Sequence, residues 1–148
     1  MSQSFQLQNG DLVVTSGRAF QVVKNRDKLI QDLKLWILEH YGEDPSTPDY
    51  GSTLDTYIGS PMSQGVINQI QSEVLRVLQQ YQAMQLDNMQ NDTILYAGST
   101  TLDPSEVIAS INGLTVQAVG SILLITVSIT TLDENPTQIS IPILNNNA

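Results

Sequence analysis

The sequence contains no cysteine, which excludes disulfide bonds and metal sites built on thiolates. Charged residues are also scarce: they make up 14% of the 148 residues, whereas about 25% is usual in globular domains. Serine, threonine, asparagine and glutamine together supply 51 residues. Amide and hydroxyl side chains can be buried against another protein at a smaller desolvation cost than lysine or glutamate. This composition favours a subunit of an assembly over a free-standing enzyme.

Basic residues are few and confined to one half of the chain. All six lie between Arg18 and Arg76, so residues 77–148 carry six acidic residues and no base. Binding to nucleic acid would need clustered lysine and arginine, so we expect no nucleic-acid partner. No apolar run approaches about 18 residues and no targeting segment begins the sequence, so we expect a soluble chain without a membrane partner.

Three consecutive strands are predicted between Leu114 and Leu144. Apolar and polar residues alternate from Leu123 to Thr130 and again from Ile139 to Ile143, which is the period of half-buried strands. The 26 residues from Val107 to Leu132 contain no charge and no proline. Free sheet edges usually carry charged residues or proline, which discourage pairing with another strand. Two interpretations remain open: a sheet covered within its own domain, or a sheet that another chain completes.

Helical periodicity precedes this sheet. Apolar residues at three- and four-residue spacing predict one helix from about Arg26 to His40, capped by Asn25, and a longer one from Pro61 to Met89. Ser52 and Asp55 have the spacing of a capping box for a short helix over 54–58, and Thr93 to Ala97 suggests a short strand. Asp103 to Glu106 is another helix-start signature.

The order of these elements predicts an α+β fold. It comprises an amino-terminal β-hairpin over residues 12–23, two main helices with a short helix between them, and a carboxy-terminal antiparallel meander. Residues 11–144 are expected to form a single domain. Residues 1–10 are expected to be a polar amino-terminal arm, and residues 145–148 a polar tail.

Catalytic signatures are absent from the sequence. A glycosidase needs two carboxylates across a sugar, but Asp44, Asp49 and Asp55 fit turns and caps, which leaves Glu43 without a local role. The only histidine, His40, has no metal-ligand pattern around it, and no glycine loop matches a phosphate cradle. We therefore expect no enzyme, no cofactor and no metal.

Three local motifs resemble a known family. Gly42-Glu43 at a helix end, Tyr50-Gly51-Ser52-x-Leu54 before a short helix, and the closing acidic helix with its meander resemble the baseplate wedge proteins of contractile phage tails. This family is also described as "lysozyme-like" and as the sheath initiator. Its loop signature is Glu-Pro-Arg or Gly-Glu-Arg. This chain departs from it, because Asp44 and Pro45 follow Glu43.

The resemblance implies a structural role in a virion tail baseplate assembled in the host cytoplasm. It implies several copies per particle, with other wedge and hub proteins and the tail sheath protein as partners. A sheath strand would extend the meander by β-augmentation. The residues expected to bind partners lie in the loop after the first helix and in the sheet: Glu43, Pro45, Tyr50, Gly51, Leu54, Thr126, Ser128, Ile139 and Ile141. The alternatives are a baseplate subunit of a non-contractile tail or of a phage-like secretion or injection system, and a cell-wall glycoside hydrolase.

Overall fold

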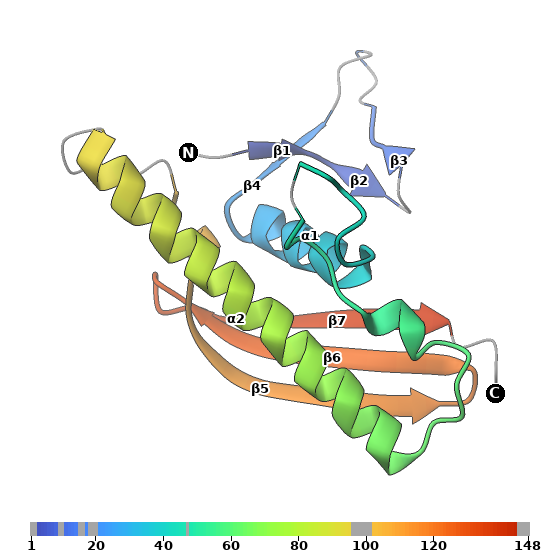
Figure 1. Cartoon of the computed structure of the whole chain (residues 1–148). Coiled ribbons are helices and arrows are strands. Elements are labelled where there is room, and N and C mark those ends of the chain that lie inside the picture. Colours follow the sequence, from blue (N-terminus) through green and yellow to red (C-terminus); the bar gives the residue numbers. More distant parts are fainter. Residues whose placement is uncertain are drawn as a thin grey trace.

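The carboxy-terminal part of the chain forms a three-stranded antiparallel sheet (Figure 1). The computed structural model describes residues 3–8, 11–14, 17, 21–46, 48–95 and 102–144. Strands β5 (Ile108–Val119), β6 (Ile122–Thr131) and β7 (Pro136–Leu144) follow in sequence order, with β6 in the centre. Tight turns join them, and Gly120 in the first turn has a φ of 60°. The predicted meander and the α+β class are confirmed.

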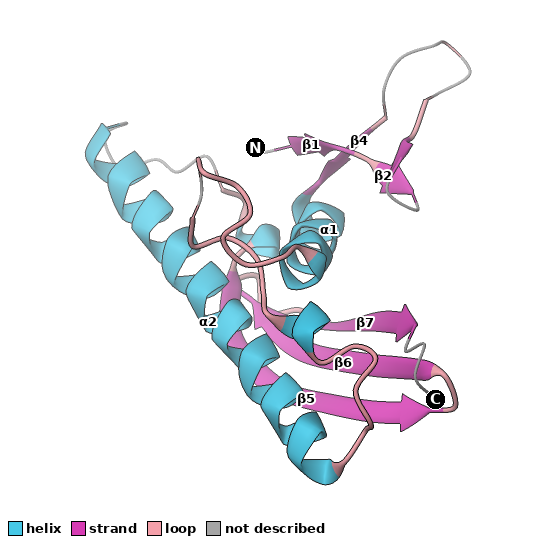
Figure 2. Cartoon of the chain, turned by 45° about the vertical axis from the view of Figure 1, so that its right-hand side comes forward, coloured by secondary structure: helices cyan, strands magenta, loops and turns pink. Residues whose placement is uncertain are grey.

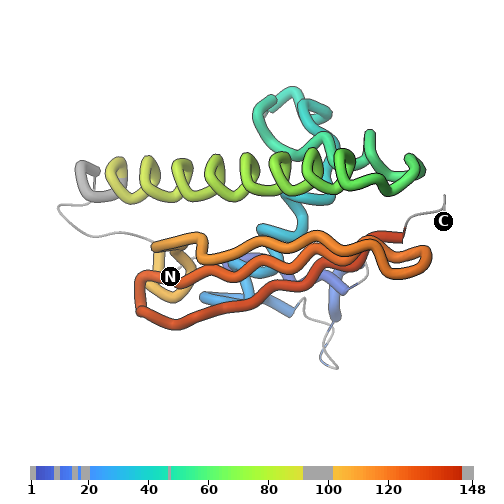
Figure 3. Tube along the Cα trace, turned by 90° about the horizontal axis from the view of Figure 1, so that it is seen from below, coloured from blue at the N-terminus to red at the C-terminus, as the bar shows by residue number. Residues whose placement is uncertain are grey.

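Two helices cover one face of this sheet. Helix α1 (Asn25–Leu38) and the 32-residue helix α2 (Gln64–Leu95) form a layer above the strands, as Figure 3 shows for α2. The core lies between the layers. It is built from Leu29, Leu33, Trp36 and Ile37 of α1, from Ile70, Val74, Val77, Leu78 and Tyr81 of α2, and from the inward side chains of the sheet. The regularly spaced apolar residues of the long helix therefore pack against its own domain.

Alternation along β6 separates the two faces of the sheet. The odd-numbered residues from Leu123 to Thr131 are buried under the helices, whereas the even-numbered residues from Ile122 to Thr130 face the other side. The same alternation runs through β7. Strands β5 to β7 contain no charged residue, so the open face of the sheet is neutral.

The amino-terminal strands lie beyond α1, on the side away from the large sheet (Figure 2). β1 (Gln3–Phe5) pairs with β4 (Val22–Lys24), and β2 (Leu7–Gln8) pairs with β3 (Asp11–Leu12). Of the predicted hairpin, the described residues show the hydrogen bond from Gln21 N to Val13 O, but β3 and β4 pair with β2 and β1 rather than with each other. The pairing of residues 3–8 was not foreseen, because that stretch is polar.

Several predicted helix ends are wrong. Asn25 does not cap α1: it is the first helical residue, with a φ of 55°. Helix α2 begins at Gln64 rather than at Pro61, since the Ser63 hydroxyl accepts the Val66 N–H. The helix also continues through residues 93–95, where a strand was predicted, while residues 96 and 97 lie outside the described residues. Helical continuation from a long, packed helix outweighs the weak local strand preference there.

The start of β5 is held by glutamines of α2. The predicted helix start at Asp103 forms η2 (Pro104–Glu106), with its capping box intact. Beyond it, the buried Gln85 amide donates to Glu106 O at 2.6 Å and accepts from Ile108 N at 3.0 Å. Gln82 donates to the carbonyls of Ile108 and Ala109. Both helix-to-strand contacts set where the sheet begins. In the described ranges, no helix is long and apolar enough to cross a membrane.

Replacing Gln85 with alanine should lower the free energy of unfolding by at least about 2 kcal/mol, because two buried main-chain groups lose their partner. Gln79→Ala on the exposed part of the same helix is the control, and its effect should stay within about 0.5 kcal/mol. Urea unfolding followed by circular dichroism measures both. Equal losses in the two variants would contradict this account of the Gln85 contacts.

Candidate partner-binding surfaces

The connecting loop (residues 39–53) is closed at its base by main-chain hydrogen bonds. Tyr41 N donates to Ser52 O at 2.9 Å, and Ser52 N donates to Glu39 O at 2.8 Å. The buried Ser52 hydroxyl also donates to Ile37 O at 2.5 Å. The two ends of the loop are therefore fastened to the last turn of α1.

Three polar side chains of α2 form hydrogen bonds to the second half of the connecting loop, at residues 49, 51 and 53. Arg76 Nη2 donates to Gly51 O at 3.2 Å, and Gln80 donates to Asp49 O at 2.8 Å. Glu73 accepts the Thr53 N–H at 2.8 Å and forms an ion pair with Arg76 at 2.7 Å. These contacts make the loop an ordered part of the domain.

Electrostatics strengthen this attachment. Burial raises the pKa of Glu73, but hydrogen bonds from Arg76 and from the Thr53 backbone outweigh it and bring the pKa below its usual value. The hydrogen bond to Glu73 in turn raises the pKa of Arg76. The Arg76 guanidinium also lies 5.1 Å from the centre of the Tyr41 ring. An ionised Glu73 and Arg76 pair is thus the stable form at neutral pH.

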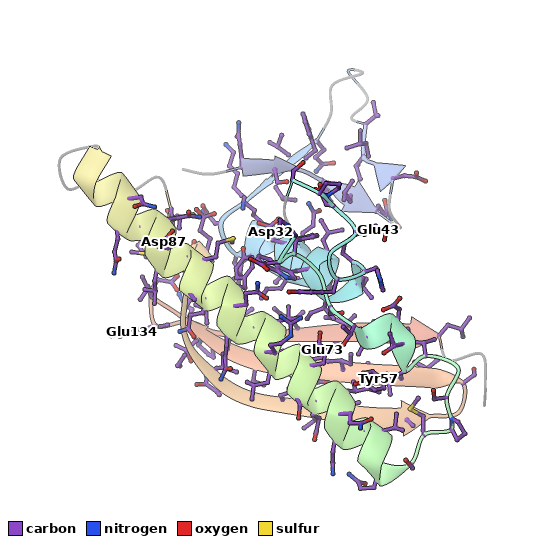
Figure 4. The ribbon with its side chains drawn as sticks, in the orientation of Figure 1. Asp32, Glu43, Tyr57, Glu73, Asp87 and Glu134 are labelled. Carbon is purple, nitrogen blue, oxygen red and sulfur yellow. The ribbon has the colours of Figure 1, made fainter. Side chains whose placement is uncertain are left out.

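The predicted loop residues divide into exposed and packed groups. Glu43 and Pro45 are exposed, and Figure 4 labels Glu43 on the loop. Tyr50 is half-buried with its ring centre 4.9 Å from that of Trp36, and burial is the main cause that raises its pKa. Gly51 is buried. Partners can therefore reach the side chains of Glu43 and Pro45, whereas Tyr50 and Gly51 support the loop from within.

Leu54 and the predicted capping box need correction. Leu54 starts η1 (Leu54–Thr56) and is buried in the core, so its side chain is not available to a partner. The capping box predicted for this helix is wrong: the N-cap is Thr53, without a side-chain bond. Asp55 instead lies 2.8 Å from His40 Nδ1, which draws its carboxylate away from the helix start.

The predicted sheet residues also fall into two groups, one buried and one on the open face of the sheet. Ile139 and Ile141 are buried against the helices, which corrects their proposed use as side-chain contacts. Thr126 and Ser128 are half-buried on the open face of β6. Because β6 is paired on both sides, these two residues can meet a partner only through the sheet face and not through a strand edge.

The two outer strands present different edges. At the turn that leads from β6 into β7, Thr131 N donates to Asn135 O. From there, hydrogen-bonded pairs alternate with non-bonded pairs along the two strands. This register turns the main chain of residues 136, 138, 140 and 142 toward the free edge. Positions 136 and 142 are prolines and have no N–H to offer, so this edge is interrupted at both ends.

By the same reasoning, the free edge of β5 is regular from residue 113 to 119, after two register shifts between residues 108 and 113. Val119 and Ile122 flank the two-residue turn, so the odd-numbered residues from 113 to 119 bond to β6. Leu114, Val116 and Ala118 therefore turn their N–H and C=O groups outward. This edge contains no proline and no charge. It is the sheet edge most open to another strand.

Sequence reasoning missed Glu73, Arg76 and Gln80. One signal for Arg76 is visible in the sequence: it is the only basic residue after Lys34. Its contact with Gly51 spans 25 positions, and no local pattern encodes such a distance.

Comparisons with known proteins point to the fold. No protein family model matches the sequence, and no curated protein matches it. A solved structure from Geobacter sulfurreducens, named as a candidate tail lysozyme, superposes with a TM-score of 0.53. The two chains share a fold. The alignment covers 90% of this chain and 96% of that protein at 14% identity.

Gly51→Ala should destabilise the chain by several kcal/mol. Gly51 has a φ of 102°, and an added Cβ would lie 2.7 Å from His40 O and 2.8 Å from Glu39 O. Gly59→Ala is the control, since its φ is also positive at 88° but no atom lies within 4 Å of the new Cβ. Thermal unfolding should show the larger loss for Gly51→Ala. A loss of stability of the same size in both variants would show that backbone strain, and not contact with the Glu39 and His40 carbonyls, causes the effect.

Proposed function

We propose that this chain is a structural subunit of a phage-tail baseplate, where it links wedge or hub proteins to the first ring of tail sheath. The observation that carries the proposal is the sheet: three uncharged strands, one face covered, and one outer strand whose free edge is regular and free of proline from residue 113 to 119. The shared fold with a protein named for a tail supports it. So does the sequence resemblance to baseplate wedge proteins.

The sheath protein is proposed to add a strand to β5. β-augmentation needs a row of free main-chain donors and acceptors, which residues 114, 116 and 118 supply. The β7 edge is a poorer template, because Pro136 and Pro142 each remove a donor. Natural proteins use prolines to discourage pairing at an edge. The sheet is thus built to accept a strand on one side.

Wedge or hub proteins are proposed to contact the connecting loop. Glu43 and Pro45 are exposed on a loop whose two ends are held by hydrogen bonds to α1 and α2. A rigid loop binds with less loss of conformational entropy than a mobile one. This surface and the β5 edge are formed by different elements, so one chain can bind two partners at once.

Cell-wall hydrolysis is the second candidate, because the solved neighbour is named as a lysozyme. The carboxylates of this chain do not favour it. Asp55 pairs with His40, Asp44 accepts the Ser46 N–H, and Glu73 is bound to Arg76. A glycosidase instead holds two carboxyl groups about 5–10 Å apart around the substrate. A peptidoglycan-clearing assay with the purified chain should show no clearing, and clearing would overturn the structural role.

Ala118→Pro should impair sheath attachment. It removes one outward N–H from the β5 edge without touching a bond to β6, and we expect at least a roughly tenfold loss of the chain from assembled particles. Ser140→Pro does the same on the β7 edge and should change incorporation by no more than about twofold. Electron microscopy of particles, with the chain quantified in them, measures both effects.

Thermal unfolding of the two isolated variants provides the control for this comparison. Both substitutions lie on outer strands of one sheet, so their effects on stability should be similar. Greater loss of incorporation with Ser140→Pro would place the partner strand on β7. Normal incorporation of Ala118→Pro would show that no strand joins β5.

A further inference from the structure

A groove of about 730 Å³ lies between the two helices, away from the sheet edges. Its walls come from α1, from residues 48–50 of the connecting loop, from the second half of α2 and from residues 102 and 106. Trp36, Tyr50 and Tyr81 form its aromatic floor, while Leu35 and Met84 stand exposed at its rim. We refer to this site as the Trp36 groove. Its size lies within the range of about 300–1,000 Å³ that is usual for binding pockets.

The floor of the Trp36 groove contains a polar group without a partner. Trp36 is 6% exposed, and its indole N–H has no hydrogen-bond acceptor among the described residues. The two tyrosine rings pack against the indole, with ring centres 4.9 and 5.2 Å from it. A buried donor without an acceptor costs about 1–3 kcal/mol. Because this N–H is itself shielded from solvent, the surface that the floor offers a ligand is aromatic.

The rim of the Trp36 groove is acidic. Asp32, Asp49 and Asp87 line it, and Figure 4 labels Asp32 on α1 and Asp87 on α2. The one basic residue in the lining, Lys28, is already bound to Asp32 at 2.5 Å. Asp49 and Asp87 accept hydrogen bonds only from the neutral groups of Tyr41 and Asn91 in the described part of the chain. The groove thus attracts cations and repels anions.

From this combination we infer that the Trp36 groove binds a segment of a partner protein in which an apolar side chain stands next to lysine or arginine. The apolar side chain packs on the aromatic floor between Leu35 and Met84. The basic side chain reaches the rim carboxylates of Asp49 and Asp87. A polypeptide offers an apolar and a basic side chain together at short spacing.

A second copy of this chain fits the groove poorly. The chain has a net charge of −9, so two copies repel each other at an acidic rim. Three of its six basic residues are already paired with carboxylates: Arg26 with Asp133, Lys28 with Asp32, and Arg76 with Glu73. The inference does not rest on the proposed tail function, because neither the β5 edge nor Glu43 and Pro45 line the groove.

Selection from a random peptide library displayed on phage tests the inference. The immobilised wild-type chain captures peptides, and those that also bind the empty support are removed. The tightest selected peptide is then synthesised and titrated into the chain. Trp36 is the only tryptophan, so its fluorescence reports directly on the floor of the groove.

The selected peptides should be enriched in an apolar residue beside lysine or arginine. Met84→Lys should weaken binding at least about tenfold, because it replaces an apolar wall with a like charge. The control is Leu86→Lys on the same helix. Leu86 is exposed but does not line the groove, so this variant should bind within about twofold of the wild type. Higher salt should weaken wild-type binding, and Asp49→Asn with Asp87→Asn should reduce that salt dependence.

Three results would overturn the inference. The first is that no peptide is enriched, or that acidic peptides are. The second is that Met84→Lys and Leu86→Lys bind alike. The third is that the wild-type chain forms a dimer which Met84→Lys abolishes, since this would assign the groove to a second copy. Leu35→Lys provides a second variant on α1, in case circular dichroism shows that Met84→Lys does not fold.

Discussion

Burial of one sheet face beneath α2 is the constraint on which the rest of this structure depends. Burying the apolar residues of β5, β6 and β7 requires a continuous apolar cover, and the apolar side of α2 provides most of it. The same packing leaves the opposite sheet face in contact with solvent. That face tolerates exposure because its side chains are rich in hydroxyls and amides, which remain soluble without charge.

The polar side chains of α2 extend this packing to the surrounding loops. Gln82 and Gln85 bind the main chain at the start of β5, and Arg76 and Gln80 bind the main chain of the connecting loop. Side-chain donors that satisfy otherwise unpaired carbonyls let irregular segments lie against a helix without a desolvation penalty. The abundance of glutamine in the sequence thus has a structural use within the chain, in addition to any role at an interface.

The three candidate binding surfaces differ in the chemistry they offer. The β5 edge presents main-chain donors and acceptors, which bind any strand of suitable register. The Trp36 groove presents an aromatic floor with an acidic rim and selects by side-chain type and charge. The connecting loop presents exposed side chains on a fixed backbone. Because different elements form most of each surface, a partner on the β5 edge leaves the groove and the loop accessible.

Local patterns in the sequence determined the elements of this protein. Apolar residues at every second position located β6 and β7, and apolar residues with a period of 3.6 located α1 and α2. Asp103 to Glu106 specified a capped turn. Each of these signals depends on neighbours only a few residues apart. Only the tertiary structure decided which side chains serve a site. Ile139 and Ile141 turned inward, Asp55 bonded to His40 rather than to its helix, and the Trp36 groove formed between two helices that are far apart in sequence. Burial and long-range hydrogen bonds arise when elements pack, and a local pattern does not specify which elements will meet.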